Sequence, residues 1–343
     1  MDRMTNRRVI LCAAWVCMGL IMAGTMAFGA ESPKEFYRGK TIRWIVASEP
    51  GSPTDLITRT IAPFLASEIG GKVRIEDRKG DEGINFAYKQ ASRDGLTLAV
   101  KTSSSIIGNE ILKAAGVQYE TDKFNFVADV FPSIKVFQIS PKLPYKTLNL
   151  LRKAKGLRGG GTTTKGDLAL SSAVMFEVLG LDGKVITGYE GKKNLTLGLA
   201  RGEIDFMCTS DSMAMKDAEN GYAINMMTAG DKRSAAVPNV PTLLELGVKV
   251  SKEMETVHKF VSSGGTAVVL PPGVAPERVE YLRQVFQQLS NNQNLQKAME
   301  KLTGMKTAFA PGQELQQDMA EIKADKEMVN KLDAIFKKYT AVR

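Results

Sequence analysis

The chain has 343 residues, of which 43% are hydrophobic and 24% charged, an ordinary globular composition whose length predicts two domains. The formal net charge is +9, but the basic residues are scattered, without long runs or interleaved aromatic residues, so we expect no nucleic-acid partner. Beyond residue 30 the sequence has one histidine, His258, and one cysteine, Cys208, which excludes an internal disulfide and the usual zinc ligand sets. We therefore expect neither metal nor cofactor.

The first thirty residues have the pattern of an export signal. Three arginines precede an apolar run over residues 9–26, and small residues follow at Ala27 and Gly29. This pattern predicts a cleavable signal peptide over residues 1–29, with cleavage after Ala27 or Gly29. A single membrane anchor is the alternative, because the apolar run approaches the length needed to span a bilayer.

The next segment reads as a strand, a tight loop and a helix. Residues 42–47 form a short apolar run typical of a buried strand, and the loop Ser48–Gly51 ends it. Ser52 suits the N-cap of the following helix, Pro53 its first position, and Asp55 has the capping-box spacing. Because a helix start carries unpaired N–H groups and a partial positive charge, this loop could receive an anion.

Further strands and helices alternate along the next part of the chain. We predict strands over 72–77 and 96–100, separated by a helix over 84–92. The second of these strands leads into a hydroxyl-rich loop, Thr102–Ser105, before a helix over 106–115.

A second conspicuous loop follows in the middle of the chain. Glycines at 159–161 lead into Thr162–Thr164 and Lys165, ahead of an amphipathic helix predicted over 168–179. Glycine would allow a ligand to approach the backbone closely, and the hydroxyls could donate to an oxygen-rich ligand. Asp167 lies three residues after Thr164, again the capping-box spacing. A flexible surface loop with an ordinary cap is the alternative.

The alternation of strands and helices continues to the C-terminal helices and favours a largely parallel α/β architecture. Several short motifs follow one another along the chain in this order: Tyr37–Arg43, Glu49–Asp55, Glu76–Gly83, Asp94–Leu98, Tyr189–Gly191, Gly202–Asp205, Val240–Gly247 and Leu270–Gly273. In this order and spacing the chain resembles the extracytoplasmic solute receptors of tripartite tricarboxylate transporters, also called Bug receptors.

The resemblance implies an α/β, two-lobed periplasmic-binding-protein (venus-flytrap) fold, each lobe a mixed, mostly parallel sheet flanked by helices. It implies that residues 30–135 and 262–343 form lobe 1 and residues 136–261 form lobe 2. It also implies a monomeric periplasmic protein, not an enzyme, that captures a small carboxylate-containing solute in the cleft and delivers it to the membrane permease subunits of the transporter.

The resemblance, with the loop chemistry, places the ligand-binding residues on two loops and a few neighbouring positions. They are Ser48, Glu49, Gly51, Ser52, Thr54, Asp55, Thr102, Ser103, Ser104, Gly161, Thr162, Thr163, Thr164, Lys165, Asp167, Tyr189 and Asp211. Among them the serines and threonines are the better direct contacts, whereas Asp55 and Asp167 are better explained as caps, because a carboxylate repels an anionic solute.

Two residues depart from the family pattern, in which Pro-Gly-Gly precedes the aspartate. Pro53 removes one backbone donor, and Glu49 places an acid beside a carboxylate site. Either Glu49 points away or the ligand carries a cation, amide or hydroxyl there, which argues against a simple dicarboxylate.

Two other functions remain open. An exported hydrolase or transferase would use a Ser or Thr of the two hydroxyl-rich loops as nucleophile, with His258, Lys101 or Lys165 as its base. A receptor that signals to a membrane sensor kinase would have the same fold and pocket.

Overall fold

The computed structural model describes residues 31–306 and 308–340, so the predicted signal peptide at 1–29 lies outside the described residues. Of the first unit, which ends at Phe36, only residues 31–36 are described, and they include the start of helix α2 (Pro33–Tyr37). The second unit, from Tyr37, contains both sheets. Among the described residues no helix is both long enough and apolar enough to cross a membrane.

The first sheet has six strands: β1 (Thr41–Val46), β2 (Lys72–Asp77), β3 (Thr97–Thr102), β4 (Asn125–Asp129), β11 (Thr266–Leu270) and β12 (Ala310–Pro311). Their order is β12-β4-β11-β3-β1-β2. Strand β1 pairs in parallel with β2 and β3, whereas β11 runs antiparallel to β3 and β4. Trp44 of β1 is fully buried, which fits the apolar run of this strand.

Helices cover this sheet and form the first lobe with it: α3 (Pro53–Glu68), α4 (Asp81–Lys89), α5 (Ser103–Ile111), the 3-10 turn η2 (Thr121–Lys123), α11 (Pro276–Ser290), α12 (Gln293–Thr303) and α13 (Gly312–Ala324). Helix α3 packs on β2, and α13 packs on β4. The ring of Phe286 on α11 meets Trp44 edge to face, with ring centres 5.8 Å apart.

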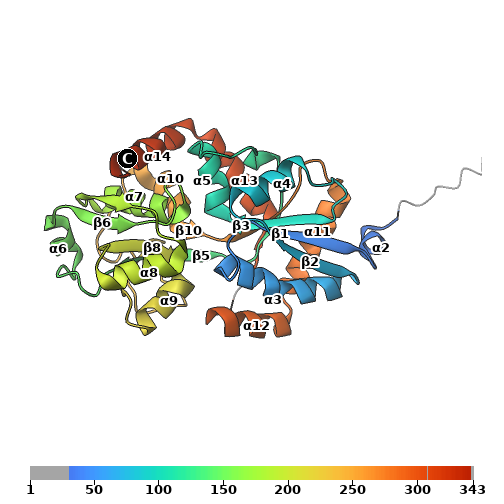
Figure 1. Ribbon diagram of the computed structural model, residues 1–343, viewed down its shortest axis with the longest axis horizontal. Coiled ribbons are helices and arrows are strands. Elements are labelled where there is room, and N and C mark those ends of the chain that lie inside the picture. Colours follow the sequence, from blue (N-terminus) through green and yellow to red (C-terminus); the bar gives the residue numbers. More distant parts are fainter. Residues whose placement is uncertain (1–30, 307, 341–343) are drawn as a thin grey trace, which may run out of the picture. The chain divides into compact units, whose positions relative to one another are not determined.

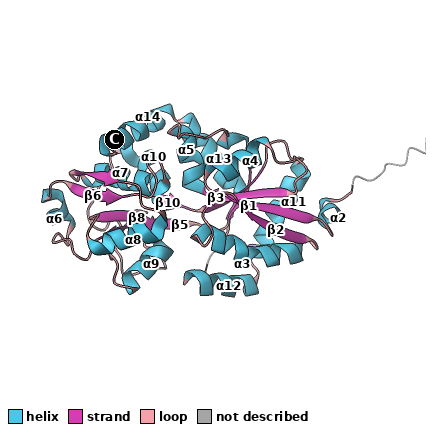
Figure 2. Cartoon of the chain, in the orientation of Figure 1, coloured by secondary structure: helices cyan, strands magenta, loops and turns pink. Residues whose placement is uncertain are grey.

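The second sheet is built from β5 (Ser133–Ile139), β6 (Leu157–Gly160), β7 (Gly183–Ile186), β8 (Phe206–Ser210), β9 (Ile224–Thr228) and β10 (Ser263–Gly264). Its order is β10-β5-β8-β6-β7, with β9 also paired to β5. The helices of this second lobe are α6 (Leu148–Lys153), α7 (Asp167–Leu179), α8 (Gly191–Arg201), α9 (Asp211–Glu219), α10 (Lys252–Ser262) and α14 (Lys326–Tyr339). Figures 1 and 2 show the helices around both sheets.

The predicted two-lobed α/β fold with mixed sheets is confirmed. A larger share of the strand pairs is antiparallel than the alternation of strands and helices along the sequence suggested. Strands β6, β7 and β8 pair in parallel, but β5 runs against both β8 and β9. The reason is that β5 and β11 belong to segments that cross between the sheets, and each enters its sheet against the direction of its neighbours.

Of the three crossings between the lobes in the described part of the chain, two lie side by side, and the third runs from α13 to α14 through Asp325. The chain passes from β4 to β5 through residues 130–132 and returns from β10 to β11 through Gly265. The Val130 N–H donates to the Thr266 carbonyl across 3.0 Å. The Asp129 carboxylate accepts hydrogen bonds from the N–H groups of Thr266, at 2.7 Å, and Phe131, at 3.1 Å. A Cβ on Gly265 would lie 1.7 Å from this carboxylate, so only glycine allows the return segment to pass here.

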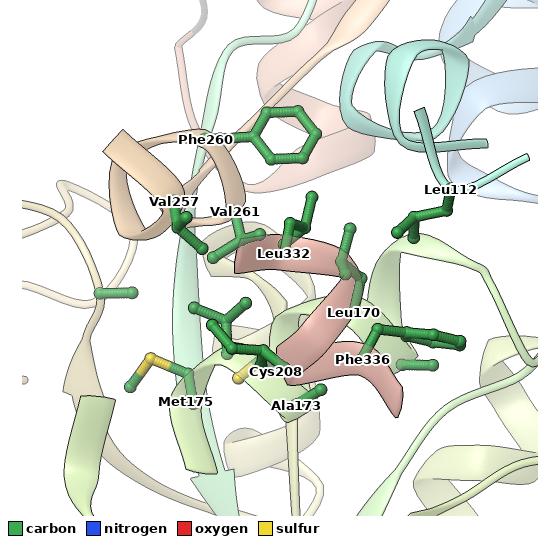
Figure 3. Packing of buried hydrophobic residues seen from close by; sticks show 14 of the residues in the cluster. Leu112, Leu170, Ala173, Met175, Cys208, Val257, Phe260, Val261, Leu332 and Phe336 are labelled. Atoms are coloured by element: carbon green, nitrogen blue, oxygen red, sulfur yellow. The ribbon is translucent and has the colours of Figure 1, made fainter. Parts of the chain in front are cut away.

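The last helix joins the second lobe, although the whole segment 262–343 was expected in the first. Its apolar stripe, which includes Leu332 and Phe336, packs on α7 and α10, as Figure 3 shows. Tyr339 stacks on Phe176 of α7 with ring centres 5.0 Å apart, and its hydroxyl lies 2.7 Å from Glu177. Amphipathic periodicity identifies the helix but not the partner of its apolar face.

The buried Asp129 should make stability depend on pH. Burial raises its pKa to about 6, above the usual value for an aspartate near 3.9 in the unfolded chain. The folded state therefore binds the proton more tightly, and the contribution of Asp129 to the free energy of unfolding increases as pH falls from 7 towards 4. Between pH 7 and pH 4.5 the gain should be about 2 kcal/mol.

Urea unfolding of the wild type and of Asp129→Asn at both pH values measures this contribution. The stability difference, wild type minus variant, should grow by that amount at the lower pH. Asp333→Asn, which removes a partly exposed carboxylate paired with Lys337 on α14, serves as the control and should show a constant difference. A constant difference for Asp129→Asn would contradict the prediction.

Candidate functional site

A cavity of about 730 Å³ is lined by residues of both lobes. The cavity is lined by segments at the ends of strands. These are the loop after β1, the end of β3, the loop after β6 and the end of β8. The crossing segments add Phe131, Ser133 and Gly265. The carboxyl ends of strands are the usual position for a ligand site in α/β sheets.

Five helices present their N-terminal ends to this cavity. The first turn or the N-cap of α3, α5, α7, α8 and α9 lines it. In α3 the Ser52 hydroxyl caps the Asp55 N–H, whereas the other four have no side-chain cap from the described residues. Helix starts carry partial positive charge and N–H donors, although the first N–H of α5 already donates to the Gly265 carbonyl and the Ser212 N–H of α9 to Asp211 Oδ1. Their convergence produces a site suited to an anion without requiring a net cationic lining.

The loop before α3 is held by its own aspartate. Asp55 accepts the Gly51 N–H at 2.7 Å and pairs with Arg59 Nε at 2.7 Å. The predicted role of Asp55 as a structural residue is therefore supported by geometry, and the Gly51 N–H is already used. Ser48 and Ser52 lie on the cavity wall with their hydroxyl oxygens 2.8 Å apart. Glu49 also lines the cavity, but its carboxylate lies 2.9 Å from Lys79 Nζ and is 59% exposed.

The hydroxyl-rich segment after β3 enters the helix earlier than predicted. Helix α5 starts at Ser103, so Ser103 and Ser104 are buried in its first turn and do not line the cavity. Thr102 and Ser105 line it instead. The cause is the helical period, which turns residues 103 and 104 away from the face shared by 102 and 105.

Asp167 connects the two lobes. It is the first residue of α7 rather than a capping-box residue, because the N-cap is Gly166. One carboxylate oxygen accepts the Ser104 hydroxyl of α5 at 2.5 Å, and the other pairs with Lys135 of β5. Both Lys135 and Asp167 line the cavity, so their charges compensate each other at the point where the lobes meet.

The glycines at 160 and 161, which were expected to let a ligand approach the backbone, allow neighbouring segments of the protein to pack closely instead. A Cβ on Gly160 would lie 2.2 Å from Ile204, and a Cβ on Gly161 would lie 2.5 Å from the Cβ of Ala169. Lys165 does not reach the cavity either. Its Nζ donates to the carbonyls of Leu112, at 2.6 Å, and Lys113, at 3.2 Å, at the end of α5. A lysine at a helix C-terminus is a favourable arrangement.

Nine of the seventeen predicted site residues line the cavity: Ser48, Glu49, Gly51, Ser52, Thr54, Thr102, Thr162, Thr163 and Asp167. The other eight do not: Asp55, Ser103, Ser104, Gly161, Thr164, Lys165, Tyr189 and Asp211. Tyr189 packs over Gly198, and its hydroxyl lies 3.3 Å from Glu203. Asp211 is buried, which raises its pKa, and accepts the Ser234 hydroxyl at 2.6 Å.

Several lining residues were missed by sequence reasoning. They are chiefly on the second lobe: Lys135, Lys192, Thr196, Thr209, Ser210, Asp217 and Tyr222. Ser210 precedes Asp211 at a helix start, so the cap pattern could have revealed it. Lys192 directly follows the motif Tyr189–Gly191. Asp217 has no local signal, because its pairing with Lys192 exists only in the folded chain.

Two mixed sheets with a cavity lined from both lobes define the class of two-lobed solute-binding proteins. The sequence matches the family described as "Tripartite tricarboxylate transporter family receptor" over residues 57–340, so the chain belongs to this receptor family. The membership predicted from the ordered motifs is thereby confirmed.

Similar proteins agree in length and in fold. A protein from Cupriavidus necator named "UPF0065 protein in gbd 5'region" is 25% identical and covers 95% of this chain and 98% of its own. Two structures from Rhodopseudomonas palustris share the fold. MatC with bound malate has a TM-score of 0.67 at 20% identity, covering 87% of this chain and 99% of its own. Rpa4515 with adipate has a TM-score of 0.71 at 19% identity, covering 86% and 97%.

The position of Asp55 predicts that a residue outside the cavity wall controls binding. Asp55→Ala removes the acceptor of the Gly51 N–H and the partner of Arg59, and should lower the free energy of unfolding by about 2 kcal/mol. Because the loop of Ser48 and Ser52 then loses its anchor, the Kd for a carboxylate ligand should rise about tenfold, which corresponds to 1.4 kcal/mol.

Calorimetric titration and urea unfolding measure the two effects. Asp77→Ala is the matched control, since Asp77 is the other partner of Arg59, at 2.7 Å, and does not line the cavity. It should change either quantity by less than about 1 kcal/mol. Unchanged affinity in Asp55→Ala would refute the anchoring role.

Proposed function

We propose that this chain is an extracytoplasmic receptor that captures a small carboxylate-containing solute in the cavity. It would deliver the solute to the membrane subunits of a tripartite tricarboxylate-type transporter. The observation that carries the proposal is the convergence of five helix N-termini, four of them without a side-chain cap in the described residues, on one cavity. A carboxylate is the natural complement of such donors.

The contents of the cavity also favour a small organic acid. Twelve serine and threonine residues line it and can donate to carboxylate or hydroxyl oxygens. Its volume of about 730 Å³ is in the range of small-molecule pockets. The acids in the two similar structures, malate and adipate, are of the size that such a cavity accommodates. We propose Ser48, Ser52, Thr54, Thr102, Thr162 and Thr163 as direct contacts.

The lobes would close on the solute by bending at the paired crossings, residues 130–132 and Gly265. Lobe 1 would then consist of residues 37–132 and 265–324, and lobe 2 of residues 133–264 and 326–339. We further propose that the protein acts as a monomer in the periplasm after removal of the signal peptide, residues 1–29. The arginine-led apolar segment supports this location.

The hydrolase alternative has less support. A Ser or Thr nucleophile needs a base within hydrogen-bond reach. Lys165 donates to backbone carbonyls of α5, Lys101 pairs with Asp81, and His258 does not line the cavity. A receptor for a membrane sensor kinase would use the same cavity, and its partner would differ rather than its ligand chemistry.

Ligand binding should appear in a screen of small organic acids against their neutral methyl esters. An acid at a hundredfold its Kd should add about 2.7 kcal/mol to the free energy of unfolding and raise Tm, whereas the ester should not, because it lacks the charge that the helix ends stabilise. Thermal unfolding identifies the ligands and calorimetric titration gives Kd. The proposal is wrong if neutral solutes bind and no acid does.

Thr102 offers a sharper test of the cavity wall. Thr102→Val keeps the side-chain shape but removes a hydroxyl that lines the cavity, so the Kd for an acid should rise about tenfold, the usual effect of losing a hydrogen bond to a charged group. Thr164→Val is the matched control, because Thr164 is exposed and does not line the cavity. Equal effects of the two changes on Kd would contradict this assignment.

A further inference from the structure

All the acidic side chains that line the cavity are paired with lysines. The lining contains three acids, Glu49, Asp167 and Asp217, and three lysines, Lys135, Lys192 and Lys193. Each acid pairs with a lysine: Glu49 with Lys79, Asp167 with Lys135 and Asp217 with Lys192. Lys193 is exposed and has no ion-pair partner among the described residues, so the charge of a ligand is met by this one lysine together with helix ends and hydroxyl groups.

The pair Lys192–Asp217 differs from the other two. Glu49 is more than half exposed at its pairing with Lys79, and Asp167 uses both carboxylate oxygens, one for Ser104 and one for Lys135. Asp217 uses only Oδ2, which lies 2.6 Å from Lys192 Nζ. Its Oδ1 accepts no hydrogen bond from residues 31–306 and 308–340.

Lys192 also retains one donor. Its ammonium group has three N–H bonds, and two are directed to Asp217 Oδ2, at 2.6 Å, and to Thr196 Oγ1, at 2.7 Å. The pair is largely enclosed, since the side chain of Asp217 is 7% exposed and that of Lys192 16%. An enclosed donor and an enclosed acceptor without protein partners favour a ligand group that satisfies both.

We propose that the Lys192–Asp217 pair selects a solute whose second polar group is neutral and both donates and accepts hydrogen bonds, with a carboxamide as the best match. The inference rests on the proposed function, in which the solute's single carboxylate is held by the helix ends. The amide oxygen accepts from Lys192 Nζ, and the amide N–H donates to Asp217 Oδ1. The ligand class is thus a monocarboxylate with a terminal amide or hydroxyl group, in preference to a dicarboxylate.

A second carboxylate fits this pair poorly. Burial lowers the pKa of Lys192, and the nearby Asp217 opposes this effect by supplying the counter-charge. The lysine therefore has no need of a negative charge from the ligand. A second carboxylate would approach Asp217 and leave its Oδ1 without a donor, so repulsion and lost hydrogen bonding both act against it.

The test compares two solutes of equal length, adipate and its monoamide, by calorimetric titration at pH 7. The wild type should bind the monoamide at least tenfold more tightly than adipate. In Asp217→Asn the acid is replaced by an amide of the same size, and Lys192 then lacks its counter-charge. A ligand carboxylate now supplies that charge, so the preference should shift at least tenfold towards adipate.

Glu203→Gln is the matched control, because it removes one negative charge from the second lobe outside the cavity. Its ratio of the two Kd values should equal that of the wild type. Circular dichroism verifies that Asp217→Asn is folded, and the wild-type ratio tests the proposal even if this variant is not. A wild-type preference for adipate, or the same ratio in folded Asp217→Asn, would overturn the inference while leaving the proposed function intact. If neither solute nor any other small acid binds, the proposed function fails.

Discussion

The pairing of the two crossing segments around Asp129 is the constraint on which the rest of the architecture depends. One carboxylate oxygen accepts the N–H groups of Thr266 and Phe131, and Gly265 lets the return segment pass without a clash. Because both crossings run side by side, the ends of strands from both sheets contribute to one cavity. Helices that start directly after such strands must then present their N-termini to it. The electrostatic character of the site thus follows from topology before any lining side chain is specified.

This origin explains how a cavity lined by as many acids as lysines can suit an anion. Lys135 and Asp167 neutralise each other in an ion pair. The Ser104 hydroxyl donates a hydrogen bond to Asp167 and so joins the two lobes. A dipole of a helix end is fixed by the backbone and does not titrate. Binding through helix ends and hydroxyl groups consequently depends less on pH than binding through lysines would. It also leaves the side-chain charges available for discrimination between solutes.

Sequence reasoning identified the features that are local. The run 42–47, the cap at Ser52 and the anchoring aspartate Asp55 could be predicted because their partners lie within a few residues. The ordered motifs then identified the family and with it the two-lobed fold.

The errors arose wherever a partner is distant in sequence. Lys165 looked like a ligand contact because its acceptors at the end of α5 are more than fifty residues away. Gly160 was expected to let a ligand approach the backbone, because the side chain of Ile204 that lies close to it is contributed by another segment. The packing of the last helix on α7 and α10 could not be predicted for the same reason, since periodicity shows an apolar face but not what covers it.

The two walls of the cavity differ in the charged pairs that they carry, and this difference indicates which wall discriminates between solutes. The first-lobe wall presents hydroxyls and the backbone of the α3 loop, and its one acid, Glu49, is turned to Lys79 near the surface. The second-lobe wall carries the enclosed pair Lys192–Asp217. Generic recognition of a carboxylate uses the helix starts and hydroxyl groups of both walls, whereas discrimination between solutes of similar size needs groups whose hydrogen bonds remain unsatisfied without the right ligand. The departures at Glu49 and Pro53 therefore alter how the α3 loop is built, and the groups proposed to set specificity lie at the start of α8 and in the last turn of α9.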